Sequence, residues 1–214
     1  MTPRSRLIVF EGIDGVGKTT LCQKLKEALE MQGMKAVWYE EGEDRYKGFN
    51  LIKPFIKAKA PIDASLLFYL ASSIYKSRII EKLLKKQWVL CDRYIYSTLA
   101  YHIIHGADKN LLSSLVDLPI RKPDFTFLIT AKESVRTKRA KLRRHSNAND
   151  FLEKRPGNLV ARMEKELKKF QPIIVDNSSE GIEEALRAIF THLGPICRES
   201  SLFERTEPTN KPAT

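Results

Sequence analysis

The stretch at residues 7–20 reads LIVFEGIDGVGKTT, and it decides the fold. An apolar run of strand length, residues 7–10, leads through a glycine-rich turn into apolar residues at helical spacing as far as Gly33. The residues from Gly12 to Thr19 match the pattern G-x-x-x-x-G-K-[ST] at every fixed position. A strand, a glycine loop and a helix in this order predict a phosphate-binding loop (P-loop) at the start of an α/β domain.

Each fixed position of this loop has a physical role in holding the phosphates of a nucleotide such as ATP. The glycines let the backbone curl so that several N–H groups point inward, and the following helix adds the partial positive charge of its N-terminus. Lys18 can reach the outer phosphates as a point charge, and Thr19 offers a hydroxyl group to Mg²⁺. The predicted ATP-binding residues are Gly12, Ile13, Asp14, Gly15, Val16, Gly17, Lys18, Thr19 and Thr20.

Beyond this loop, short apolar runs alternate with longer helical patterns. The further strands are expected at residues 36–39, 88–91, 125–129 and 173–175. Pro61 is expected to open the longest helix, which ends near residue 85. This alternation predicts a three-layer α/β/α fold with a five-stranded parallel sheet. Ligands of such sheets bind beyond the carboxyl ends of the strands, so the loops that follow the strands form the candidate site.

The charge of the chain favours an anionic partner. Its 37 Lys and Arg residues against 26 Asp and Glu residues give a formal net charge of +11, which suits phosphorylated small molecules or nucleic acid. The excess is concentrated at residues 132–144, which contain seven basic residues and one acid. Because no aromatic residues are interleaved with these charges, the pattern disfavours a nucleic-acid partner.

Length and composition set the broad class of protein. The 214 residues are typical of one domain. No apolar run reaches the roughly 18 residues of a membrane span, and the apolar run at residues 7–10 is too short for a secretory signal. The three cysteines have no paired spacing, which favours reduced thiols. These features together predict a cytoplasmic protein without a membrane partner.

Two segments of the chain resemble the thymidylate kinase family, whose members phosphorylate dTMP with ATP. Residues 10–20 read FEGIDGVGKTT, and residues 91–101 read CDRYIYSTLAY, close to the family pattern D-R-Y-x-x-S-x-x-A-Y. Pro123 and Asp124, which enter the fourth strand, add a third and weaker match. The resemblance implies a P-loop kinase with ATP as phosphoryl donor, Mg²⁺ as cofactor and small nucleotides as substrates. Members of this family often form dimers, so the resemblance is compatible with a homodimer.

The resemblance also implies roles for residues of the acceptor site. Asp14 would lie near the sugar 3′-hydroxyl, Phe68 would stack on the base and Tyr101 would pack near the sugar. Arg93 would grip the acceptor phosphate by a forked contact that a lysine could not reproduce. The implied substrate-binding residues are Asp14, Phe68, Arg93, Ser97 and Tyr101, with Ser97 given a structural part. Asp92 ends a strand, where a carboxylate can hold Mg²⁺ with Thr19, directly or through water, or orient the acceptor phosphate.

Thymidylate kinases place a catalytic arginine either in the P-loop or on a mobile lid. Because none of the variable loop positions 13–16 is basic, the lid must supply this charge in an active enzyme. Arg139 and Arg143 lie four residues apart, on one face of the helix that enters the predicted lid at about residues 140–157. The implied catalytic residues are Lys18, Asp92, Arg93, Arg139 and Arg143. The kinase domain is expected to cover residues 1–194, and residues 195–214 are expected to form a flexible tail.

The chain departs from the family pattern at three places, two in the acceptor half of the site and one in the predicted lid. Residues 39–45 read YEEGEDR where the family has R-E-P-G-G, Ser72 replaces an arginine that reads the thymine edge, and Asp150 lacks its arginine neighbour. Three hypotheses therefore stay open. The chain is a thymidylate kinase, a related P-loop kinase acting on another nucleoside monophosphate or nucleoside, or a nucleotide-binding module without turnover.

Overall fold

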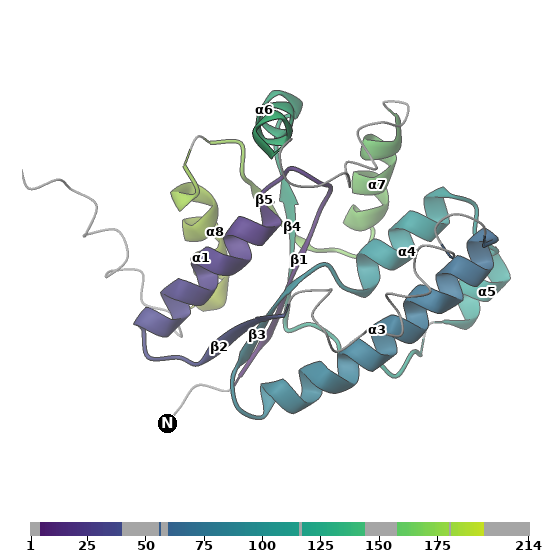
Figure 1. Ribbon diagram of the computed structural model, residues 1–214, viewed down its shortest axis with the longest axis horizontal. Coiled ribbons are helices and arrows are strands. Elements are labelled where there is room, and N and C mark those ends of the chain that lie inside the picture. The colour runs from purple at the N-terminus through teal and green to yellow at the C-terminus, as the bar shows by residue number, and fades with distance from the viewer. Residues whose placement is uncertain are drawn as a thin grey trace, which may run out of the picture.

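The computed structural model describes residues 5–39, 56, 60–115, 117–143, 158–179 and 181–194. These residues form a five-stranded sheet in which every pairing is parallel (Figure 1). The strands are β1 (Leu7–Glu11), β2 (Ala36–Tyr39), β3 (Trp88–Asp92), β4 (Phe125–Thr130) and β5 (Ile173–Asp176), and their order across the sheet is β2-β3-β1-β4-β5. The predicted parallel sheet is confirmed.

Helices cover both faces of this sheet, as predicted. One face carries α1 (Lys18–Met31) and α8 (Glu183–Leu193), and the other carries α3 (Ile62–Leu84), α4 (Ile95–Ile104) and α5 (Lys109–Ser114) (Figure 1). Two further helices, α6 (Glu133–Arg143) and α7 (Asn158–Lys168), stand near the carboxyl end of the sheet (Figure 1). None of the described helices combines the length and the apolar character that a membrane crossing needs.

Strand β1 lies in the centre of the sheet and is buried along its whole length. Its side chains alternate between two hydrophobic clusters: Ile8 and Phe10 belong to the one that includes α1 and α8, while Leu7 and Val9 belong to the one that includes α3. Phe10 stacks on Phe127 of β4 with 5.8 Å between ring centroids. Burial on both faces explains why this strand has a continuous apolar run instead of alternating polarity.

The third motif, Pro123 and Asp124, anchors the end of the sheet opposite to the strand carboxyl ends. Asp124 accepts a hydrogen bond from the Leu7 N–H at 2.8 Å and pairs with Arg6 at 3.2 Å and Arg121 at 2.7 Å. Burial alone would raise the pKa of Asp124, but the Leu7 N–H and the Arg121 charge outweigh burial and lower it. Asp124 therefore fixes the start of β1 beside the start of β4.

The strand order places a topological switch point at β1. The chain runs from β1 to β2 and then to β3 on one side of β1, whereas β4 and β5 lie on the other side. At such a point the loops at the carboxyl ends diverge and leave a crevice in which α/β proteins bind their ligands. The loops after β1 and β3, which carry the two sequence motifs, meet there.

Several sequence predictions lie outside the described residues. They are the altered acceptor segment at residues 40–45, Asp150 and the lid tip beyond residue 143, and the tail at residues 195–214.

Candidate active site

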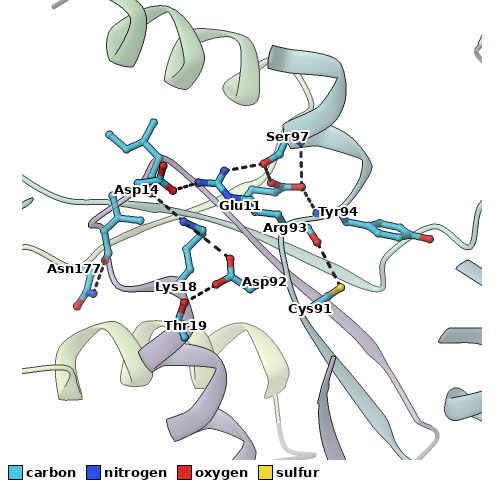
Figure 2. Close-up of polar contacts among 12 residues, drawn as sticks. Glu11, Asp14, Lys18, Thr19, Cys91, Asp92, Arg93, Tyr94, Ser97 and Asn177 are labelled. Atoms are coloured by element: carbon cyan, nitrogen blue, oxygen red, sulfur yellow. Dashed lines mark hydrogen bonds and ion pairs between the residues drawn. The ribbon is translucent and has the colours of Figure 1, made fainter. Parts of the chain in front are cut away.

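The P-loop at residues 12–19 curls tightly at the carboxyl end of β1 (Figure 2). Gly12 has a φ of 141°, and a Cβ atom at this position would lie 2.4 Å from the carbonyl oxygen of Ile129 in β4. Only glycine fits there, because both the backbone conformation and the close approach exclude a side chain. The first glycine of the motif thus lets the loop leave β1 directly beside the end of β4.

Lys18 is buried and folds back on the loop. Its Nζ donates to the Ile13 carbonyl oxygen at 3.0 Å and lies 4.0 Å from Asp92 Oδ1. Burial, together with the neighbouring Arg93 charge, lowers the pKa of Lys18 from 10.5 to about 8, against the opposing pull of nearby carboxylates. Lys18 is therefore charged at neutral pH, and its ammonium group is near enough to the loop to exchange the Ile13 carbonyl for a phosphate oxygen.

We expect the lowered pKa of Lys18 to appear in the pH dependence of ATP use. The charged form prevails below about pH 8 and is lost above it, so kcat/KM for ATP should fall as pH rises through that value. Bound phosphates raise the lysine pKa, so ATP binding at about pH 8.5 should take up a proton. Calorimetry in two buffers of different ionisation enthalpy measures this uptake. A buffer-independent enthalpy for the wild type would contradict the prediction.

Thr19 and Asp92 form an oxygen-rich corner beside Lys18 (Figure 2). Thr19 Oγ1 donates to Asp92 Oδ2 at 2.7 Å, whereas Asp92 Oδ1 is buried and finds no hydrogen-bond partner in the described parts of the chain. Mg²⁺ prefers oxygen ligands, and in nucleotide sites it keeps several waters and takes one or two protein groups along with the phosphates. A hydroxyl and an unsatisfied carboxylate oxygen fit that donor set.

Arg93 joins the acceptor motif to the P-loop. Its guanidinium donates to Asp14 Oδ1 at 2.5 Å and to Ser97 Oγ at 3.1 Å (Figure 2). Burial alone would lower the pKa of Arg93, but the carboxylates of Asp14, Asp92 and Glu11 outweigh burial and raise it. The structure thus brings together Asp14, Arg93 and Ser97, three residues that the sequence placed at the acceptor site.

The backbone of Arg93 is held in an uncommon conformation by groups that the sequence analysis missed. Its φ is 65°, in the left-handed region, which is uncommon for residues other than glycine. Its N–H donates to the Phe10 carbonyl oxygen at 2.9 Å, and its own carbonyl accepts from Lys76 Nζ at 2.9 Å. Lys76 is buried on α3 near the Tyr39 and Tyr94 rings. These contacts fix the direction in which the Arg93 side chain leaves the sheet.

Glu11, the last residue of β1, is a second missed residue. It is 1% exposed, and its carboxylate accepts from the Tyr94 N–H at 3.0 Å, the Ser97 N–H at 3.3 Å and the Ser97 hydroxyl. It therefore caps α4, whose own N-cap residue makes no side-chain cap. Burial raises the pKa of Glu11, although the Ser97 hydroxyl and the Arg93 charge oppose this effect. Glu11 ties α4, and with it Ser97, to the strand that begins the P-loop.

Asn177, which follows β5, fastens the far side of the P-loop. Its backbone N–H donates to the Thr130 carbonyl at 2.8 Å and its Nδ2 donates to the Val16 carbonyl at 2.7 Å. Gly17, with a φ of 96°, comes so close that a Cβ atom there would lie 2.5 Å from Asn177 Nδ2. The loop is thereby held between β5 on one side and the turn after β3 on the other.

Arg139 reaches the same part of the loop from α6. Its guanidinium donates to the Val16 carbonyl at 3.3 Å and to the Ser179 carbonyl at 3.4 Å. Arg143 ends α6, and its side chain lies outside the described residues. The helix that enters the predicted lid therefore contacts the P-loop through at least one of the two predicted arginines.

Phe68 and Tyr101 belong to one aromatic cluster between α3 and α4. Phe68 meets Tyr69 edge-on with centroids 5.4 Å apart, Tyr69 lies 5.8 Å from His102, and Tyr101 stacks on His105 at 4.1 Å. Burial lowers the pKa of His102, which keeps this ring neutral near pH 7. The cluster presents flat rings of the kind on which a nucleobase can stack.

A P-loop at the switch point of a parallel sheet, facing an arginine from the turn after the neighbouring strand, is the arrangement of a P-loop nucleotide kinase. The model of the family described as Thymidylate kinase matches residues 10–189. The chain therefore belongs to the thymidylate kinase family, and it is an ATP-dependent nucleoside monophosphate kinase.

Individual relatives agree with this assignment. A probable thymidylate kinase of Methanocaldococcus jannaschii is 31% identical over 191 residues, which cover 88% of this chain and 96% of that protein. A thymidylate kinase of Orientia tsutsugamushi is 33% identical over 160 residues, covering 70% of this chain and 71% of that protein. The crystal structure of thymidylate kinase from Ehrlichia chaffeensis matches with a TM-score of 0.63 at 26% identity, covering 89% of this chain and all of that one. A solved structure of thymidylate kinase from Candida albicans has a TM-score of 0.66 at 23% identity and covers 89% of this chain and 91% of its own, which supports the fold.

Proposed function

We propose that the chain transfers the γ-phosphoryl group of ATP to dTMP, giving ADP and dTDP. The observation that carries this proposal is the position of Arg93, which donates both to Asp14 of the P-loop and to Ser97 of α4. A phosphate held by Arg93 would lie beside the loop that binds the donor. The relatives named as thymidylate kinases support dTMP as the acceptor.

On the donor side, the curled P-loop backbone would accommodate the β- and γ-phosphates, and Lys18 would move from the Ile13 carbonyl to a phosphate oxygen. Thr19 and Asp92 would hold Mg²⁺, which when bound neutralises charge on the same phosphates. Arg139 would add positive charge where it reaches the loop at Val16. This half of the site matches its sequence motif at every fixed position.

On the acceptor side, Arg93 would hold the monophosphate in its planar fork, and Asp14 would accept a hydrogen bond from the 3′-hydroxyl. An oxygen of the monophosphate then attacks the γ-phosphorus in line. The new phosphorus–oxygen bond forms as the bond to the β,γ-bridging oxygen breaks, and ADP leaves with that electron pair. The attacking phosphate is mostly dianionic at neutral pH, since its second pKa is about 6, so the step needs no general base.

Phe68 and Tyr101 would position the base and the sugar of the acceptor.

One observation favours a second candidate acceptor. Ser72 lies one helical turn beyond Phe68 on α3, where its short hydroxyl side chain stands in place of the arginine of the family pattern. A kinase whose best acceptor is another pyrimidine monophosphate would fit this change. The lid at residues 140–157, the homodimer and the cytoplasmic location stay predictions.

A panel of acceptors tests the proposal. ADP release with saturating Mg-ATP is measured by a coupled assay for each deoxy- and ribonucleoside monophosphate. We expect kcat/KM for dTMP to exceed that for every other acceptor by about tenfold or more, which corresponds to ~1.4 kcal/mol of discrimination. A value for CMP or AMP equal to that for dTMP would refute thymidine specificity, and a higher value for dCMP or dUMP would favour the second candidate.

A further inference from the structure

Helix α6 packs directly on the tip of the P-loop, through a residue that the sequence motifs do not include. The three heavy atoms nearest to the place where a Cβ of Gly15 would lie all belong to Arg136: its Cβ and its carbonyl oxygen at 3.5 Å and its Cα at 3.7 Å. Figure 1 shows α6 above the loop that connects β1 to α1. The Arg136 side chain therefore starts at the surface of the loop.

The Arg136 side chain is also buried, and one of its donor atoms is unsatisfied. It is 9% exposed, and its Nε atom is buried and has no hydrogen-bond partner among the described residues. A buried donor without an acceptor destabilises a folded protein, so such groups call for an explanation. Arg93 and Arg139, by contrast, donate to oxygen atoms of the protein. Next to the P-loop, the Nε donor of Arg136 therefore lacks an acceptor within the part of the chain that the structure describes.

Two arginines converge on adjacent residues of the loop. Arg93, from the turn after β3, bonds to the side chain of Asp14, and Arg136, from α6, packs against Gly15. Arg93 marks the acceptor side in the proposed function, and the P-loop marks the donor side. The γ-phosphate of ATP and the phosphate of the acceptor would therefore meet near residues 14 and 15. The loop itself carries no basic side chain at these two positions.

We propose that Arg136 contacts the phosphoryl group during its transfer. This inference rests on one part of the proposed function, the transfer of a phosphoryl group from ATP to a nucleotide, and does not depend on which nucleotide is the acceptor. Negative charge on the phosphoryl oxygens and on the bridging oxygen is spread over several atoms in the transition state, and a planar guanidinium can donate to two of them. Arg139, by comparison, donates to the carbonyl oxygen of Val16 in the loop and to that of Ser179 after β5.

The test replaces Arg136 with methionine, which keeps an unbranched apolar stem and removes the charged fork. The assay uses the acceptor that the wild type phosphorylates fastest. We expect kcat to fall by about 10²- to 10³-fold, below the 10³–10⁵ range of arginine fingers because Lys18 and Arg93 remain. The KM values for ATP and the acceptor should stay within about threefold, since the contact forms in the transition state. Free guanidinium should restore part of the activity of Arg136→Ala, which a structural role would not allow.

A binding measurement gives a readout independent of turnover. ADP, aluminium fluoride and the acceptor together imitate the transferring phosphoryl group. We expect Arg136→Met to bind this combination about tenfold or more weakly than the wild type, while its affinity for ADP alone is unchanged. Lys138→Met removes one positive charge from an exposed position of the same helix and should match the wild type in both measurements.

The outcomes separate the two proposals. If Arg136→Met is folded and its kcat and its affinity for the fluoride combination are both within about threefold of the wild type, the role of Arg136 is refuted. If dTMP is not the best acceptor, the proposed acceptor is wrong, and the comparison of variants on the best acceptor still decides the role of Arg136. If Arg136→Met does not fold, Arg136→Lys decides: it keeps a stem and a charge without the fork, and wild-type kcat in this variant would overturn the inference.

Discussion

Replacing Lys18 with methionine is expected to lower kcat/KM for ATP by about 10³-fold or more while the protein stays folded. The lysine is the buried cation at the outer end of the P-loop, and backbone N–H groups cannot replace a full charge at the transferring phosphate. Methionine fills a similar volume, and removing a buried charge also removes the desolvation penalty that lowers the pKa of Lys18 to about 8. The melting temperature should therefore stay the same or rise.

The measurement is steady-state turnover with varied ATP, accompanied by thermal unfolding. The matched control is Lys24→Met on the same helix, where the lysine is exposed and pairs with Glu27 at 2.7 Å. Such a surface pair contributes about 0–1 kcal/mol, so this variant should keep wild-type kinetics. Turnover of a folded Lys18→Met protein within tenfold of the wild type would contradict the assigned role.

Replacing Arg93 with lysine is expected to lower kcat/KM for the acceptor by about 10²- to 10⁴-fold and to leave KM for ATP nearly unchanged. The charge is kept, but the fork that spans Asp14 and Ser97 is lost. Each lost charge-assisted hydrogen bond costs roughly 1.5–3 kcal/mol, and two are lost when the monophosphate occupies the site. Since both residues have a Cβ atom, the left-handed backbone at this position is equally strained in the two proteins.

Initial rates with varied acceptor at saturating ATP measure this effect. Arg78→Lys is the control, because Arg78 lies on α3, is exposed and pairs with Glu81 at 3.2 Å. It should change neither KM. If Arg93→Lys raised KM for ATP as much as KM for the acceptor, Arg93 would belong to the donor half of the site, and the assignment would be wrong.

The fold was largely predictable because strands of a parallel sheet are buried on both faces and therefore appear as short apolar runs. Leu7 to Phe10, for instance, reads as a strand without any knowledge of its neighbours. Pro61 likewise marks the start of α3, where it occupies the N-cap with a φ of −53°. The order of the strands across the sheet could not be predicted in this way. It depends on which strands pair with each other, and the apolar pattern of one strand does not show which strand lies beside it.

The site residues that belong to sequence motifs were predictable, whereas those whose role depends on being buried in the folded protein were not. The meeting of Thr19 with Asp92 follows from two motifs at neighbouring strand ends. Glu11 and Lys76 were missed because a charged residue is normally expected at the surface, and only the packed structure shows that each is buried against the turn after β3. For Arg136 a signal existed, since it lies three residues before Arg139 and shares its helical face.

The last two residues of β1 hold the acceptor turn, through the Phe10 carbonyl and the Glu11 carboxylate, and the very next residue begins the donor loop. In the proposed function, one strand would therefore set the spacing between the two reacting phosphates, separately from the residues of α3 that are proposed to face the base. Laboratory evolution toward a new acceptor can therefore vary α3, with Ser72 as the first position, while β1 is left unchanged. We expect a library built in this way to change which nucleotide is accepted and to preserve the alignment of the two substrates for in-line transfer.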